Sequence, residues 1–145
     1  MFRFAILLPA LLAGSSAFGA SPEITVTKSP TCGCCSKWED HLKANGFRVK
    51  SVSTTAFEKI KDEKKVPAPV RSCHTGVVAG YFVEGHVPAK VIQRLLKERP
   101  KNTAGLAVPG MPIGSPGMET GDRKDAYDVL RIDSKGHTTV YEAMR

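Results

Sequence analysis

The sequence predicts a single domain of the α/β class. Short β-branched segments alternate with segments of helical periodicity along most of the chain, which is the pattern of a sheet covered by helices. The 145 residues suffice for one domain whose hydrophobic core needs no disulfides. The four cysteines are too few for a small fold held together by disulfides. Their role is therefore expected to be metal binding or redox chemistry rather than structural support.

The first twenty residues have the layout of a secretory signal peptide. Arg3 precedes an apolar run at 4–12, and small residues end the segment at Gly19 and Ala20. We expect cleavage near those two residues and a mature domain at 21–145; the alternative is a buried N-terminal helix. Ser15 stands where a lipoprotein signal needs cysteine, so no lipid anchor is expected. No later segment has the roughly 18 apolar residues that a membrane-spanning helix requires.

The first half of the mature chain alternates between strand and helix patterns. A β-branched strand is predicted at 24–27 and an alternating strand at 47–52. Between them, Trp38 and Leu42 lie four residues apart on the apolar face of a helix, which ends at the glycine stop of 45–46. This βαβ unit places both strands side by side and parallel.

The next elements are a short helix, a hairpin and a third helix. Thr55 and Glu58 have the spacing of a capping box for the short helix. Its lysines alternate with acidic residues and predict a solvated face: Lys59, Lys61, Lys64 and Lys65. A hairpin follows at 74–83, and the third helix runs from Pro88 to Pro100. The apolar face of that helix comprises Val91, Ile92, Leu95 and Leu96.

This order is that of a thioredoxin-like β-α-β-α-β-β-α sandwich. A Gly/Pro-rich loop is expected at 105–121. An added C-terminal β-hairpin then follows, with strands at 127–133 and 137–141 around a turn at 134–136. The added hairpin completes the fold prediction.

The cysteines are placed where this topology brings distant residues together. Cys32, Cys34 and Cys35 follow the first strand, and Cys73 directly precedes the third. In the predicted fold the first strand is central and the third runs antiparallel beside it. The end of one and the start of the other then lie at the same edge of the sheet. We therefore expect all four sulfurs to meet.

Four converging sulfurs favour a metal site. A thiol at a helix N-terminus has its thiolate form stabilised, and soft thiolates select Cu(I), with zinc as a further option. The Cys-x-x-Cys spacing of Cys32 and Cys35 also fits a redox disulfide. The alternative arrangement is thus a Cys32–Cys35 disulfide with Cys34 and Cys73 buried or paired.

Further soft or imidazole donors lie elsewhere in the chain. Met111 and Met118 belong to the Gly/Pro-rich loop, where neither has an evident core role, although methionine also caps apolar surfaces. His86 is a candidate site residue and His74, beside Cys73, a weaker one. The remaining histidines are expected to be ordinary surface residues: His41 and His137.

Four motifs in order resemble the CopG-like copper-resistance proteins, over essentially the whole mature chain. They read SPTCGCC at 29–35, SCHT at 72–75, EGHVP at 84–88 and GLAVPGMPIGSPGME at 105–119. The resemblance implies a periplasmic thioredoxin-like protein that holds a polynuclear Cu(I) cluster, with several ions per chain, in copper resistance. Carried over by position, the cluster ligands are Cys32, Cys34, Cys35 and Cys73, with Met111, Met118 and His86 as neighbours.

The resemblance leaves open whether the protein is an enzyme. Copper oxidoreductase activity is one option, because the same sulfurs serve both the copper and the disulfide couples. The alternative function is a thiol–disulfide oxidoreductase in which Cys32 attacks and Cys35 resolves. Copper ions and other periplasmic copper-handling proteins are the expected partners. Nucleic acid is not, since the basic residues are scattered without interleaved aromatics.

Overall fold

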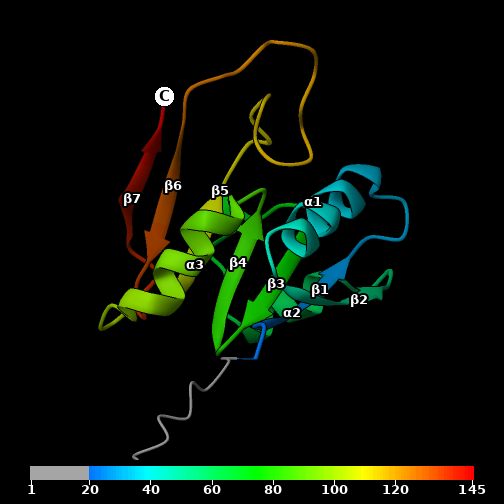
Figure 1. Ribbon diagram of the computed structural model, residues 1–145. Coiled ribbons are helices and arrows are strands. Elements are labelled where there is room, and N and C mark those ends of the chain that lie inside the picture. Colours follow the sequence, from blue (N-terminus) through cyan, green and yellow to red (C-terminus); the bar gives the residue numbers. More distant parts are fainter. Residues whose placement is uncertain (1–19) are drawn as a thin grey trace, which may run out of the picture.

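The computed structural model describes residues 20–145 and contains one mixed sheet of seven strands with three α-helices (Figure 1). Apart from Ala20, the predicted signal peptide lies outside the described residues. The strands are β1 (Glu23–Lys28), β2 (Arg48–Ser53), β3 (His74–Val78), β4 (Tyr81–Gly85), β5 (Gly105–Val108), β6 (Tyr127–Ile132) and β7 (Thr138–Met144). The helices are α1 (Gly33–Ala44), α2 (Glu58–Glu63), α3 (Ala89–Glu98) and the 3₁₀ turn η1 (Ala68–Val70).

The strand order is β2-β1-β3-β4-β5-β6-β7. The pairs β1–β2 and β4–β5 are parallel and the other pairs are antiparallel. Strand β1 is therefore internal, with β3 antiparallel beside it, and Lys28 at its end faces His74 at the start of β3. This confirms the predicted edge where the two cysteine segments meet.

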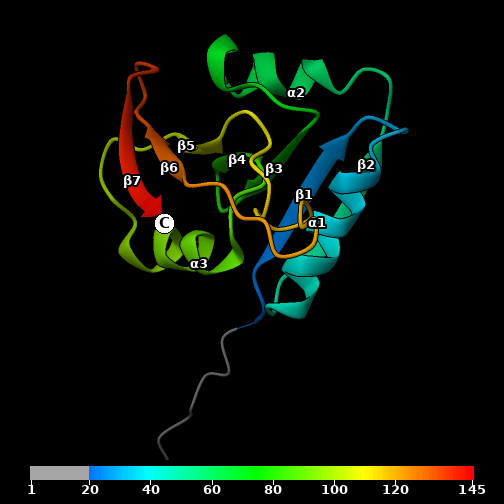
Figure 2. The same cartoon turned by 90° about the horizontal axis from the view of Figure 1, so that it is seen from above.

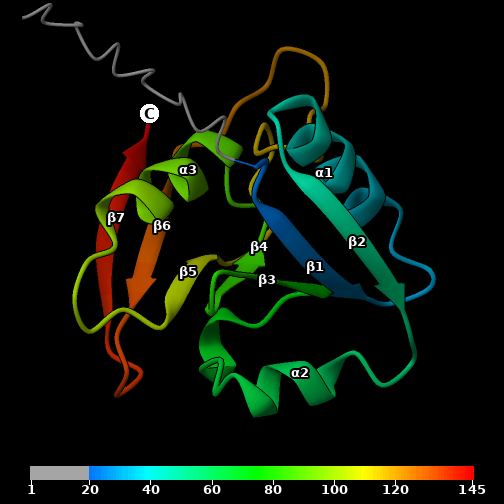
Figure 3. The same cartoon turned by 60° about the horizontal axis from the view of Figure 1, so that its bottom comes forward.

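Helices cover the sheet on both faces. In Figures 2 and 3, α1 and α3 lie on one face and α2 on the other. The larger core forms on the α1 and α3 face, and a smaller one on the α2 face, so successive residues of a strand belong to different cores. Val83 packs in the larger core and Phe82 in the smaller, as the two-residue period of a strand requires. Both faces of β4 are thus buried.

The prediction of a loop throughout 105–121 was wrong at its start. Gly105–Val108 forms β5, which pairs with β4 and with β6. All four residues of β5 are buried, and a strand buried on both faces lacks the polar alternation by which strands are recognised. The predicted C-terminal hairpin is confirmed as β6 and β7, which extend the same sheet through β5.

The short helix α2 departs from expectation at both its start and its face. It begins at Glu58 after Phe57, without a side-chain cap, so the predicted Thr55–Glu58 capping box is wrong. Thr54 instead accepts a hydrogen bond from the Ala56 amide through its hydroxyl oxygen. The predicted solvated face is also wrong at Lys61, whose side chain is fully buried. Its partner is a buried glutamate in β4, described below.

Within residues 20–145, no helix combines the length and the apolar character needed to cross a membrane.

Candidate metal centre

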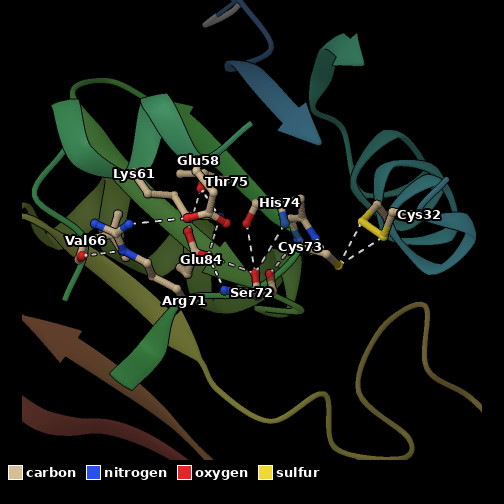
Figure 4. A network of polar contacts seen from close by, with 12 residues as sticks. Cys32, Glu58, Lys61, Val66, Arg71, Ser72, Cys73, His74, Thr75 and Glu84 are labelled. Atoms are coloured by element: carbon tan, nitrogen blue, oxygen red, sulfur yellow. Dashed lines mark hydrogen bonds and ion pairs between the residues drawn. A yellow bond between two sulfur atoms is a disulfide. The ribbon is translucent and has the colours of Figure 1, made fainter. Parts of the chain in front are cut away.

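The four cysteine sulfurs converge at one edge of the sheet, as predicted. The sulfurs of Cys32, Cys34, Cys35 and Cys73, called here the cysteine quartet, all lie within 4.8 Å of one another. The Sγ atom of Cys73 is 3.0 Å from that of Cys32 and 3.2 Å from that of Cys35, and Figure 4 shows it beside the disulfide. The Sγ atoms of Cys32 and Cys34 are 3.5 Å apart.

Local backbone contacts explain this convergence. Cys32 is the N-cap residue of α1, so Cys34 and Cys35 fall in the first helical turn, where unpaired backbone amides favour negative charge. The Cys32 amide donates to the carbonyl oxygen of Ser29 at 3.2 Å, which closes the turn before the helix. The Ser29 amide in turn donates to the carbonyl oxygen of Cys73 at 3.3 Å. Ser29 thus links the two cysteine segments directly.

The quartet contains one disulfide and two thiols. Cys32 and Cys35 are joined, while Cys34 and Cys73 are free and half-buried. The disulfide of the alternative arrangement is therefore present. The unpaired cysteines nevertheless lie at the same place as the disulfide. The same four residues can consequently supply two thiols in this state, or four after reduction by two electrons.

The thiol of Cys73 is held in its protonated form. Burial raises its pKa to about 11, the nearby Cys34 sulfur adds to the shift, and the charge of Lys61 opposes it. Metal binding at this sulfur must therefore displace a proton.

His74 adjoins the quartet as a neutral imidazole. Burial, with a contribution from His86, lowers the pKa of His74 to about 3. Its Nε2 lies 3.0 Å from the carbonyl oxygen of Gly85, which can only accept, so Nε2 carries the proton. The lone pair is then on Nδ1, 3.9 Å from the Cys73 sulfur. Trp38 packs on this ring, with centroids 4.5 Å apart.

His86 carries a second free lone pair. Its Nδ1 lies 2.8 Å from the carbonyl oxygen of Pro116 and must donate to it. Its Nε2 is buried without a hydrogen-bond partner. The ring meets that of His74 edge to face, at a centroid distance of 5.1 Å, and burial lowers the pKa of His86. A histidine suits metal ligation when one ring nitrogen is held by a carbonyl oxygen and the other is buried without a partner.

The other two histidines differ from each other. His137 is exposed, as expected, and pairs with Asp133. His41 is half-buried, and its Nε2 accepts a hydrogen bond from the Ala89 amide at 3.0 Å, so its assignment as an ordinary surface residue was wrong. Its position on the inner side of α1 faces the start of α3.

The loop between β5 and β6 packs on the start of α1. A Cβ atom placed on Gly117 would lie 2.8 Å from the backbone nitrogen of Trp38 and 2.9 Å from the backbone carbonyl oxygen of Cys34. Met118 is next to this contact and half-buried, whereas Met111 is 46% exposed. A role of either methionine as a metal ligand stays a prediction.

Two buried ion pairs near the quartet could not be identified from the sequence. Lys61 pairs with Glu84 at 2.7 Å, and Lys28 pairs with Glu39 at 3.0 Å. The only trace in the sequence is Glu84 itself, an acidic residue at an otherwise apolar end of a strand. Its partner on α2 cannot be distinguished from the exposed lysines around it.

The chain is similar to one described protein family and to two solved structures. The family described as "Protein of unknown function, DUF411" matches residues 70–118, which include Cys73, His86 and both loop methionines. No curated protein matches. A solved structure described as copper resistance protein CopG, form 2, is 45% identical. The match covers 86% of this chain and 98% of that one, at a TM-score of 0.81.

A second structure, described as form 1 of the same protein, is 46% identical. The match covers 83% of this chain and 95% of that one, at a TM-score of 0.79. With this identity over nearly the whole of each structure, the chain belongs to the CopG family of copper resistance proteins.

Proposed function

We propose that the protein is a periplasmic copper-binding protein that acts in copper resistance by holding several Cu(I) ions on the cysteine quartet. The observation that carries the proposal is the convergence of four sulfurs within 4.8 Å. Soft thiolates select Cu(I), and sulfurs this close can each bridge two ions. We infer from the order of β1 to α3 that the fold is thioredoxin-like, and from the N-terminal sequence that the protein is exported.

The two imidazoles are proposed as supporting donors. His86 has the stronger claim, because its Nε2 is buried and unpartnered. His74 offers Nδ1 toward Cys73. Both are neutral at physiological pH, so neither needs to lose a proton before it binds a metal. Met118 and Met111 are proposed as further thioether donors from the loop.

Copper redox chemistry is a natural extension of this site. Cys32 and Cys35 as thiolates can each give one electron to a Cu(II) ion, which yields two Cu(I) ions and the Cys32–Cys35 disulfide. Two electrons leave two sulfurs and one S–S bond forms, so the step balances. Cys34 and Cys73 stay free and keep two soft donors in place for the product ions.

The second candidate function is a thiol–disulfide oxidoreductase, which the Cys32–Cys35 disulfide favours. In that mechanism Cys32 attacks a substrate disulfide and Cys35 resolves the mixed disulfide, while Cys34 and Cys73 are incidental. Reduction of insulin should then survive Cys34→Ser and Cys73→Ser.

Metal analysis of protein purified from the periplasm separates the two functions. We expect more than one copper ion per chain and thiols that react only after a Cu(I) chelator is added. Cys34→Ser and Cys73→Ser should each lower the copper content, since each removes a sulfur of the quartet. His137→Gln serves as the control, because His137 is exposed. A copper-free protein with a single disulfide would favour the oxidoreductase. Recovery of the protein from the cytoplasm instead of the periplasm would contradict export.

A further inference from the structure

We propose that Glu84 is a positioning residue that holds Cys73 against the other three cysteines. Cys73 lies one residue before β3, so it stands outside the strand pairing that begins with His74 and Lys28. Its carbonyl oxygen accepts one backbone hydrogen bond, from the Ser29 amide at 3.3 Å, so any further support must come from side chains. The proposal concerns the geometry of the quartet, and it rests on the proposed function only for its consequence in copper binding.

The carboxylate of Glu84 contacts the chain on both sides of Cys73. Its Oε1 accepts hydrogen bonds from the Ser72 amide at 2.5 Å and from the Ser72 hydroxyl at 2.9 Å. Its Oε2 accepts from the Thr75 hydroxyl at 2.6 Å. Figure 4 shows these contacts around a fully buried carboxylate. One buried carboxylate therefore binds the segment from Ser72 to Thr75 at both ends.

The neighbouring residues of β4 and α2 complete the support. Lys61, which is fully buried, reaches from α2 to Glu84 at 2.7 Å and to the Thr75 hydroxyl at 2.8 Å. The carbonyl oxygen of Gly85, the next residue of β4, accepts a hydrogen bond from the Nε2–H of His74. Arg71 binds Asp62 of α2 at 2.7 Å, so the chain before Ser72 is tied to the same helix.

Stability alone is a weak explanation of this ion pair. A buried ion pair can often be replaced by well-packed apolar residues of similar size without loss of stability. The Glu84 oxygens, however, are shared between Lys61 and the backbone and hydroxyl groups that flank Cys73. We therefore expect an apolar replacement to release Cys73 more than it destabilises the fold.

The test measures the effective concentration of two thiols in the metal-free protein. In a Cys34→Ser/Cys35→Ser background, the remaining Cys32 and Cys73 react with oxidised glutathione to give their disulfide and two reduced glutathione molecules. The equilibrium constant of this reaction reports how well the fold holds the two sulfurs together. Lys61→Met/Glu84→Leu should lower it about tenfold, because the Ser72 amide and the Thr75 hydroxyl lose their acceptor.

Leu95→Ala is the control for stability. It truncates a core side chain on α3, on the face opposite α2, and should lower the unfolding temperature while changing the equilibrium constant less than twofold. Thr75→Val removes only one bond to Glu84 and should cause a smaller fall in the same direction, even if the double variant does not fold. An unchanged constant in the Thr75→Val protein, or in a folded double variant, overturns the proposal.

Copper binding is measured separately in the protein with all four cysteines. If the effective concentration falls and copper content falls with it, positioning by Glu84 serves the metal site. If the effective concentration falls in a protein that never binds copper, positioning stands and the proposed function fails. The two claims therefore fail independently.

Discussion

At the scale of single residues, the glycines of the loop between β5 and β6 show how closely it fits the start of α1. Gly110 and Gly117 both have positive φ, at +79° and +87°. A Cβ atom at Gly110 would meet nothing within 4 Å, whereas one at Gly117 would press on backbone atoms of α1. A substitution at either position would therefore be strained by the positive φ, but only one at Gly117 would also clash with neighbouring atoms.

We predict that Gly117→Ala is more destabilising than Gly110→Ala. Each should cost about 1 kcal/mol for the left-handed conformation, and Gly117→Ala about 2 kcal/mol more, because backbone atoms cannot easily move aside. Unfolding in urea measures both. Alkylation of Cys34 in metal-free protein should also become faster only in Gly117→Ala, as the loop is lifted from the Cys34 carbonyl. Equal effects of the two substitutions would show that the loop does not rest on α1.

How much of the site could be predicted differs by residue. The convergence of the quartet was predictable, because three of the four cysteines lie within four residues and the strand order places Cys73 beside them. The histidine lone pairs were not, because the choice of protonated nitrogen depends on the carbonyls of Gly85 and Pro116. The partner of Glu84 was equally hidden, since Lys61 is surrounded by exposed charges in the sequence.

At the scale of elements, His41 connects the two helices that flank the larger core. The start of α3 has no side-chain cap from its own N-cap residue, Pro88. Instead, Nε2 of His41 in α1 accepts a hydrogen bond from the amide of Ala89, the first residue of α3. Burial lowers the pKa of His41, as expected for an imidazole that must stay neutral to accept this bond.

This contact should make the fold sensitive to acid. Because the pKa of His41 is lower in the folded protein than in the unfolded one, its contribution is complete above pH 6.5 and is lost as the pH falls through the folded value. His41→Leu should cost about 1 kcal/mol at pH 7.5, like the loss of a helix cap, and the difference from the parent protein should shrink toward pH 4. Urea unfolding across this range measures it.

His137→Gln is the matched control for this prediction. The exposed His137 pairs with Asp133 and holds the pKa of that carboxyl below its usual value, so its pairing does not weaken when the imidazole is protonated. A pH-independent cost of His41→Leu would mean that the hydrogen bond to Ala89 is not the source of its effect.

At the scale of the whole molecule, the strands beyond α3 bring the loop to the quartet. The order from β1 to α3 was predictable from periodicity, and so was the C-terminal hairpin. The link between them was not, because β5 is short and buried on both faces. Once β5 is in the sheet, the chain leaves its end, passes over the start of α1 and returns to β6 (Figure 1). On this path, the carbonyl oxygen of Pro116 accepts a hydrogen bond from Nδ1–H of His86.

The quartet should also govern the stability of the whole domain. The Cys32–Cys35 disulfide closes a loop of only four residues, so by the chain-entropy relation it contributes about 2 kcal/mol. Copper bound to all four sulfurs would instead tie the start of α1 to the start of β3, 41 residues away along the chain. At free copper a thousandfold above the dissociation constant, this linkage contributes about 4 kcal/mol.

We therefore predict that the unfolding temperature rises from reduced metal-free protein to oxidised protein to copper-loaded protein. Thermal unfolding followed by the fluorescence of Trp38, whose ring is buried against His74, measures all three states. In Cys73→Ser the oxidised state should keep its gain, while copper should add less, because the three remaining sulfurs belong to one turn. If copper instead stabilised Cys73→Ser as much as the parent protein, the ions would be held by the N-terminal cysteines alone, and the convergence with β3 would have no part in binding them.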